Sequence, residues 1–208
     1  MAAVDQEKLG DFLKQTGGMV TAGFNCAISV LGDRLGLFKT LYEIGPCDSV
    51  RLATELKLHE RWVREWLQHQ ACVGQVHYDP DGNVFALSAE AHAVLVDADH
   101  PAYLMGAYDA ALAVFPAVEK LQDAFRTGVG MSYDEHGPDC ACGIERMGAF
   151  SKQQRLVPEM LPLIPRMQER LGAGATIADV GCGGALSTIA MAQAFPNSRF
   201  IGYDTSEV

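Results

Sequence analysis

The fold of the C-terminal part is decided by a short stretch, TIADVGCGG at residues 176–184. Its first five residues are β-branched at three positions and are followed at once by glycines, which is typical of a buried parallel strand. Residues 185–195 then have helical spacing, and residues 200–204 predict a second strand that ends at Asp204. The order strand, glycine turn, helix and strand predicts the first β-α-β unit of a doubly wound α/β sheet.

Each part of this unit suits one group of a nucleoside cofactor. Gly181 and Gly183 remove side chains from the turn, so backbone N–H groups and the positive end of the helix can approach an anionic group. A carboxylate at Asp204, at the tip of the second strand, can accept both hydroxyl groups of a ribose. The stretch therefore predicts a site for a nucleoside cofactor.

The kind of cofactor follows from the residues around the turn. A dinucleotide-binding turn would have its third glycine at position 186, where this chain has Leu186, so close approach of a pyrophosphate is disfavoured. Asp179, two residues before the first glycine, also indicates a different cofactor. A NAD enzyme and an unrelated β-α-β unit remain the alternatives.

The pattern of Asp179, Gly181 and Gly183 followed by Asp204 resembles motif I and the next acidic residue of class I S-adenosylmethionine-dependent methyltransferases. The resemblance implies that the glycine turn faces the methionine part of the cofactor, Asp204 its ribose, and Asp179 the region of its amino group. It gives a set of cofactor-binding residues: Asp179, Gly181, Cys182, Gly183 and Asp204. Ala185 stands where many of these enzymes have a third glycine.

The N-terminal part has the signals of a winged helix-turn-helix. Its expected elements are helices at 33–44, 50–58 and 60–73, then strands at 75–78 and 83–87 around a turn at 79–82. Residues 33–100 contain six Lys and Arg against eleven Asp and Glu. This acidic surface disfavours DNA, so we interpret the module as a packing or dimerisation domain.

An apolar stripe runs along the predicted N-terminal helices. It consists of Val20, Phe24, Ala27, Leu31, Leu35, Phe38 and Tyr42. Gly32 and Asp33 are expected to split the helix, with Asp33 capping the second part. The stripe packs either on its own domain, which we favour, or on a twin helix of another subunit. Trp62 and Trp66, one turn apart, are expected to lie in the core.

The resemblance extends over most of the chain. The segments LGDRLGLF (31–38), REWL (64–67), FRTG (125–128) and AFPNSRF (194–200) look like a methyltransferase family with an N-terminal winged helix, the Rv2258c-like group. In related O-methyltransferases this domain serves dimerisation and closure of the substrate pocket. The resemblance therefore implies a small-molecule methyltransferase that forms a homodimer through its N-terminal helices. A winged-helix transcriptional regulator or a dimerisation module without enzymatic activity is the alternative.

Composition narrows the function classes. A net charge of -10 over 208 residues predicts no attraction to nucleic acid or to an anionic membrane. The six cysteines are scattered and no secretory segment opens the chain, which favours a reducing cytoplasm. Residues 15–32 lack charge, but glycines and polar residues interrupt them, so we reject a membrane span.

Residues 126–143 are rich in turn formers and predict a long surface loop. His136, Cys140 and Cys142 lack a fourth ligand at a suitable spacing, so no metal site is predicted. No catalytic residue can be named; His136 is a candidate base only through its place in this loop.

The expected architecture is a mainly α winged-helix domain at 1–130, a loop and helical linker at 131–171, and the start of a Rossmann-like methyltransferase domain at 172–208. A doubly wound sheet needs five or six strands, and only two are predicted before Val208. We therefore expect an incomplete cofactor domain and no methyl transfer by the 208-residue chain.

Overall fold

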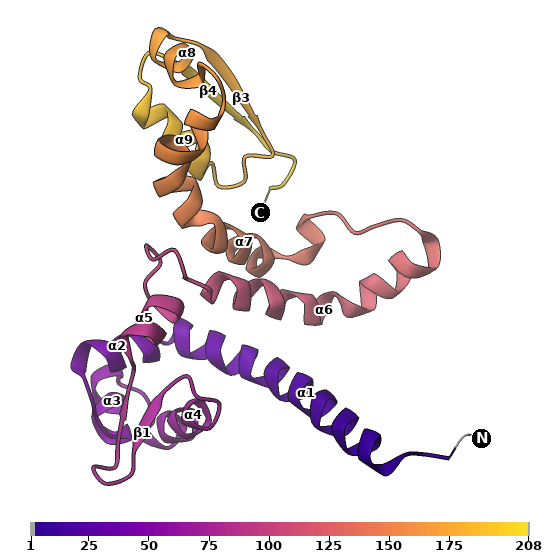
Figure 1. Ribbon diagram of the computed structural model, residues 1–208, viewed down its shortest axis with the longest axis vertical. Coiled ribbons are helices and arrows are strands. Elements are labelled where there is room, and N and C mark those ends of the chain that lie inside the picture. Colours follow the sequence, from indigo (N-terminus) through magenta and orange to yellow (C-terminus); the bar gives the residue numbers. More distant parts are fainter. Residues whose placement is uncertain (1–2, 208) are drawn as a thin grey trace. The chain divides into compact units, whose positions relative to one another are not determined.

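The computed structural model describes residues 3–207 and divides into two compact units, Met1–His92 and Ala93–Val208. Figure 1 labels their main elements. The domain boundaries expected near residues 130 and 171 both lie within the second unit. The short helix α5 (Ala89–Leu95) contains the division between the units.

The first unit contains the predicted winged helix. Its elements are α1 (Gln6–Arg34), α2 (Leu37–Ile44), α3 (Ser49–Leu56), α4 (Glu60–Cys72), β1 (His77–Asp79) and β2 (Val84–Ala86). The side chain of Asp48 caps α3 by accepting from the N–H of Arg51 at 2.8 Å. Strands β1 and β2 pair antiparallel, and the backbone of Cys47 forms an isolated β-bridge with Phe85 of β2. The expected order of three helices and a hairpin is confirmed.

Helix α1 is continuous through Gly32 and Asp33, so the expected split there is wrong. The break comes at Gly36, whose φ of +71° puts it in the left-handed region that favours glycine. Gly32 instead lets the helix approach Trp66, because a Cβ at Gly32 would lie 2.7 Å from Cε2 and 2.8 Å from Nε1 of the indole. The glycine serves close packing and not termination.

The core of the first unit forms where α1, α2 and α4 meet. Phe38 packs edge-on against Trp66 with ring centroids 4.8 Å apart, and both side chains are buried. The Nε1–H of Trp66 donates to the carbonyl oxygen of Ile28 at 3.0 Å. Trp62 is 68% exposed. The expected burial is thus confirmed for Trp66 and wrong for Trp62.

Most of the N-terminal apolar stripe is exposed. Phe24 and Val20 are 69% and 56% exposed, and Leu31 is 47% exposed, whereas Phe38 is buried. The buried face of α1 carries Cys26, Ser29, Val30 and Gly32 instead. The favoured interpretation, that the stripe packs on its own domain, is therefore wrong for most of its members.

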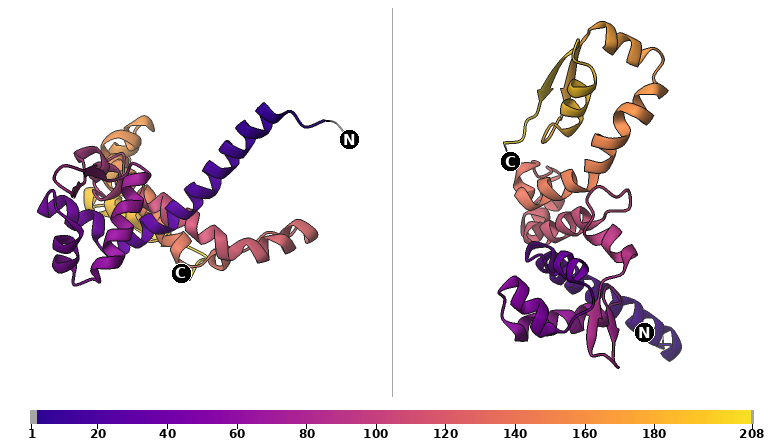
Figure 2. Two further views of the ribbon diagram at one scale, coloured as in Figure 1. Left: turned by 90° about the horizontal axis from the view of Figure 1, so that it is seen from below. Right: turned by 90° about the vertical axis from the view of Figure 1, so that its left-hand side faces the viewer.

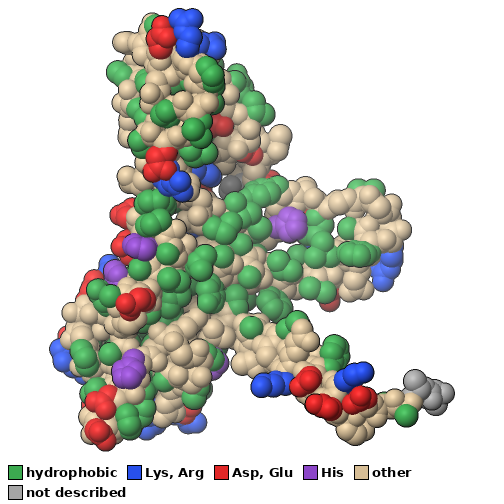
Figure 3. All heavy atoms as spheres, in the orientation of Figure 1, with side chains coloured by type: hydrophobic (Ala, Val, Ile, Leu, Met, Phe, Trp, Pro, Cys, Tyr) green, Lys and Arg blue, Asp and Glu red, His purple; other side chains and the backbone are tan. Residues whose placement is uncertain are grey.

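Helix α1 extends well beyond the other elements of its unit, as both views of Figure 2 show. Every residue from 6 to 22 is exposed. In Figure 3 this part of the helix carries charged side chains beside hydrophobic ones. None of the helices within residues 3–207 combines the length and hydropathy that crossing a bilayer requires.

The second unit begins with two closely crossing helices. It comprises α6 (Met105–Thr127), η1 (Asp134–His136), α7 (Pro138–Phe150), η2 (Ser151–Met160, π-helical), η3 (Leu161–Leu163), α8 (Met167–Ala173), β3 (Thr176–Val180), α9 (Leu186–Ala194) and β4 (Arg199–Tyr203). A Cβ at Gly143 of α7 would lie 2.6 Å from the backbone nitrogen of Ala110 in α6. Beside this crossing, Arg146 donates to the buried Asp109 and to Tyr103.

The loop expected over 126–143 is shorter in the structure. Helix α7 already begins at Pro138, so Cys140 and Cys142 are helical. Proline suits the first position of a helix, since its missing N–H would have no partner there, and Gly137 before it takes a φ of +82°. The turn formers at 137–138 therefore start a helix and do not prolong the loop.

The β-α-β unit forms as predicted. Strands β3 and β4 pair in parallel, with Thr176 opposite Arg199 and Val180 opposite Tyr203. Helix α9 connects them, and the right-hand view of Figure 2 shows it beside the two strands. The carboxyl ends of both strands therefore meet at one edge, next to the glycine turn.

Candidate cofactor site

The glycine turn after β3 is fixed beside the end of β4. Gly181 and Gly183 have φ of +77° and +52°, the region in which other residues are strained. The N–H groups of Gly181 and Cys182 donate to the carbonyl oxygen of Tyr203 at 2.7 and 3.1 Å. Because Tyr203 is the last residue of β4, the next residue, Asp204, is placed directly at the turn.

Asp204 contacts the turn through its carboxylate. Its Oδ2 accepts from the N–H of Gly183 at 2.7 Å, and its Oδ1 accepts from the N–H of Ser206 at 2.8 Å. The N–H groups of Ser206 and then Gly183 lower the pKa of Asp204 below its usual 3.8. The exposed carboxylate is thus held ionised at the edge of the sheet, as an acceptor for hydroxyl or N–H groups.

Asp179 and Cys182 take supporting positions. The hydroxyl of Thr188 in α9 donates to Oδ2 of Asp179 at 2.5 Å, which ties the end of β3 to the helix. A Cβ at Gly202 would lie 2.8 Å from Sγ of Cys182, so this glycine makes room for the thiol. Asp179 is thus tied to α9, and the Cys182 thiol packs against Gly202 of β4.

A pocket of about 400 Å³ opens over the turn. This volume lies within the roughly 300–1,000 Å³ of small-molecule sites. Of the predicted residues, Gly181, Gly183 and Asp204 line it, whereas Asp179 and Cys182 do not. The remaining lining residues are Tyr133, Ala141, Ile144, Glu145, Lys152, Gly184, Thr205 and Ser206.

Sequence reasoning missed the wall formed by α7 and η2. The carboxylate of Glu145 occupies the space that a Cβ at Gly184 would need. Lys152 lines the same pocket, one residue into η2. A single charged residue on a helix face belongs to no sequence motif. The sequence therefore contained no signal for these two residues, and only the folded chain shows that they line the pocket.

The segment before α7 closes one side of the pocket. Asp134 accepts from the hydroxyl of Ser206 and, at 3.2 Å, from the N–H of Glu207. Its neighbour Tyr133 lines the pocket, and burial raises the pKa of its phenol. The segment around residue 134 is therefore attached to the chain that follows β4.

His136 lies in η1 and does not line the pocket. Within residues 3–207, no group of three or more His, Cys, Asp or Glu side chains is arranged to hold a metal ion. The described residues that line this pocket offer it backbone donors, carboxylates, hydroxyl groups and one lysine.

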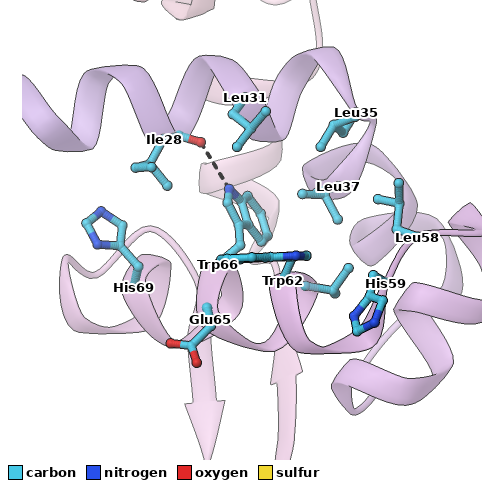
Figure 4. Close-up of a pocket in the computed structure, with 11 residues that line it drawn as sticks. Ile28, Leu31, Leu35, Leu37, Leu58, His59, Trp62, Glu65, Trp66 and His69 are labelled. Atoms are coloured by element: carbon cyan, nitrogen blue, oxygen red, sulfur yellow. Dashed lines mark hydrogen bonds between the residues drawn. The ribbon is translucent and has the colours of Figure 1, made fainter.

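A larger groove of about 830 Å³ lies in the first unit between α1 and α4. Figure 4 shows Leu31, Leu35 and Leu37 above Trp62, and the hydrogen bond from Trp66 to Ile28. Its lining is mainly aliphatic and aromatic, with His59, Glu65 and His69 as the polar members. The groove lacks the glycine turn and the Asp204 carboxylate, so the smaller pocket is the candidate cofactor site.

Comparison with known proteins supports this fold. Residues 22–97 match the family model of the Rv2258c-like winged HTH domain. Among curated proteins, none matches the chain.

Several solved structures are similar over nearly the whole chain. The structure of the mitomycin 7-O-methyltransferase MmcR is 20% identical, has a TM-score of 0.67 and covers 95% of this chain and 59% of its own. The structure of PigF with SAH is 18% identical and has a TM-score of 0.60; the match covers 98% of this chain and 59% of the PigF chain. The structure of human N-acetylserotonin methyltransferase in complex with SAM is 14% identical and has a TM-score of 0.59; the match covers 100% of this chain and 62% of the human chain.

These likenesses show the fold: an N-terminal winged helix followed by helices and a β-α-β unit arranged as in these methyltransferase structures. This chain spans about three fifths of the length of these methyltransferase structures, since it covers 59–62% of them.

Proposed function

We propose that this chain binds S-adenosylmethionine at the glycine turn and serves the methylation of a small molecule. One observation carries the proposal. The Asp204 carboxylate lies 2.7 Å from the N–H of Gly183, so an acceptor suited to ribose hydroxyls and a turn open to close approach share one edge of the β3–β4 pair.

The residues present fit this cofactor. Gly181 and Gly183 leave no Cβ at the turn, and the ionised Asp204 can accept from two vicinal hydroxyl groups. Leu186 follows the turn at the position where a dinucleotide site requires glycine. The cofactor supplies the electrophilic methyl group when bound, so the chain's own task is to bind and orient. Asp179 acts through Thr188 as a positioning residue for α9.

Isothermal titration calorimetry with S-adenosylhomocysteine tests the proposal. We expect the chain to bind it and Asp204→Asn to weaken binding at least about tenfold, because hydrogen bonds to a charged group are lost. Asp123→Asn, an exposed residue of α6, is the matched control and should bind like the wild type. No binding by the wild type, or equal affinities of wild type and Asp204→Asn, would contradict the proposal.

We also propose that the protein forms a homodimer through its N-terminal helices. The exposed side chains of α1 and the apolar groove beside Trp62 support this. A helix needs tertiary packing of its apolar face for most of its stability, yet Phe12, Leu13 and Phe24 of α1 are each more than 60% exposed. A second copy of α1 would supply the missing partner.

Sedimentation of the whole chain measures this dimer. Phe24→Asp and Leu31→Asp should shift it to monomer, because both residues are exposed apolar positions on α1 and Leu31 also lines the groove. Val50→Asp places the same charge at a valine of α3 that is 58% exposed and lies outside the groove, so it should leave the dimer intact. A wild-type chain that stays monomeric at tens of micromolar would refute the dimer.

The alternative of a DNA-binding regulator finds little support in α4. Arg64 pairs with Glu60 at 3.6 Å, and the guanidinium of Arg61 stacks over Trp62 at 5.7 Å from the ring centroid. Both cations of this helix are thus engaged within it. Binding to duplex DNA that weakens steeply with salt would favour the regulator. We further propose a cytoplasmic location. The residues that the structure describes include all six cysteines and form no disulfide, which is typical of a reducing compartment.

A further inference from the structure

Two oppositely charged side chains on the α7–η2 wall face the cofactor pocket without a partner. Glu145 and Lys152 both line the pocket, and neither makes a hydrogen bond or ion pair with any residue that the structure describes. Both are partly buried. Partial burial of unpaired charges is costly unless a ligand of complementary charge satisfies them, so the pair points to such a ligand.

The positions of the two charges follow from the helix. Glu145, Gly148 and Lys152 are spaced by three and four residues, which puts them on one helical face. Gly148 makes room between them, because a Cβ there would lie 3.2 Å from Cε and 3.7 Å from Nζ of Lys152. The lysine stem therefore lies back along α7, on the side of Glu145. At the other end, the Glu145 carboxylate touches Gly184 of the glycine turn.

We propose that Glu145 and Lys152 recognise the amino-acid end of the cofactor, a zwitterion: Glu145 accepts from its α-ammonium group and Lys152 donates to its α-carboxylate. This inference rests on the proposed function and assigns residues outside the glycine motif to it. A carboxylate at Gly184 also repels phosphate groups. Glu145 thus adds an electrostatic reason, besides Leu186, why this turn selects a sulfonium cofactor over a dinucleotide.

Binding of three ligands distinguishes the proposed contact of Glu145 from that of Lys152. S-adenosylhomocysteine carries both the ammonium and the carboxylate, its decarboxylated analogue carries the ammonium alone, and 5′-methylthioadenosine carries neither. Glu145→Gln should weaken the first two ligands by about tenfold to a hundredfold, the range for a hydrogen bond to a charged group. Lys152→Met should weaken S-adenosylhomocysteine alone. Neither variant should change the affinity for 5′-methylthioadenosine, which reports on the integrity of the adenosine site.

Calorimetry on the whole chain measures these affinities, with Glu119→Gln of α6, an exposed residue outside the pocket, as the matched control. Unchanged affinities in both variants, or equal losses for all three ligands, would overturn the inference and leave the proposed function standing. Wild-type protein that binds 5′-methylthioadenosine as tightly as S-adenosylhomocysteine would do the same. Wild-type protein that binds none of the three would overturn the proposed function and this inference with it.

Discussion

Replacing Gly32 by alanine should destabilise the first unit by about 2 kcal/mol. The new Cβ would overlap the Trp66 indole, with Nε1 at 2.8 Å, and overpacking of this kind costs about 1–3 kcal/mol. Moving the indole also stretches its hydrogen bond to Ile28, now 3.0 Å long, which is worth about 1 kcal/mol. The higher helix propensity of alanine offsets about 1 kcal/mol of this loss in the free energy of unfolding. The balance is clearly destabilising.

Gly17→Ala in the same helix is the matched control. Nothing lies within 4 Å of a Cβ at Gly17, so only the propensity gain of up to about 1 kcal/mol remains. Both tryptophans of the chain, Trp62 and Trp66, are in α4. Tryptophan fluorescence therefore reports on the first unit alone, although the whole chain is used.

Urea unfolding followed by this fluorescence is the measurement. With a slope of about 1–2 kcal/mol per molar, the midpoint of Gly32→Ala should fall by about 1–2 M, while that of Gly17→Ala stays or rises slightly. Equal midpoints for the two variants would refute the reasoning, since they would show that Gly32 serves no close contact with Trp66.

Three further predictions concern the second unit. Asp109→Asn should destabilise it by about 2 kcal/mol in chemical unfolding followed by circular dichroism, because the charged partner of Arg146 is lost in a buried position. Ala185→Gly should stabilise it by about 1 kcal/mol, since Ala185 has a φ of +62° that costs a non-glycine residue about that much; no gain would show that the turn is unstrained. The pKa of Asp204 is lowered from its usual 3.8, so its carboxylate should keep its hydrogen bonds even at pH 3.8. These contacts should be lost only as the pH falls through the lowered pKa. Carboxyl NMR shifts of Asp204 would contradict this if they titrated at or above 3.8.

The sequence alone determined the elements whose signals lie close together in the chain. The β3–α9–β4 unit was predictable because β-branched residues, glycines and the helical spacing of 185–195 act within one short segment, residues 176–204. The winged helix was predictable for the same reason, since caps such as Asp48 and the hairpin turn act on their immediate neighbours. From these elements the position of Asp204 beside the glycine turn followed, because parallel strands end at one edge.

Only the tertiary structure decided what covers each helical face. Periodicity shows that a face is apolar, but not whether another element lies against it. Trp62 and Trp66 are one turn apart and rotated by about 40° around the helix, and that rotation separates a side chain in the core from one that is 68% exposed. The same limit applies to the exposed stripe of α1 and to Gly32, whose role depends on an indole 34 positions away. Glu145 reaches Gly184 across 39 positions of sequence, because packing in space, and not local propensity, brings α7 to the turn.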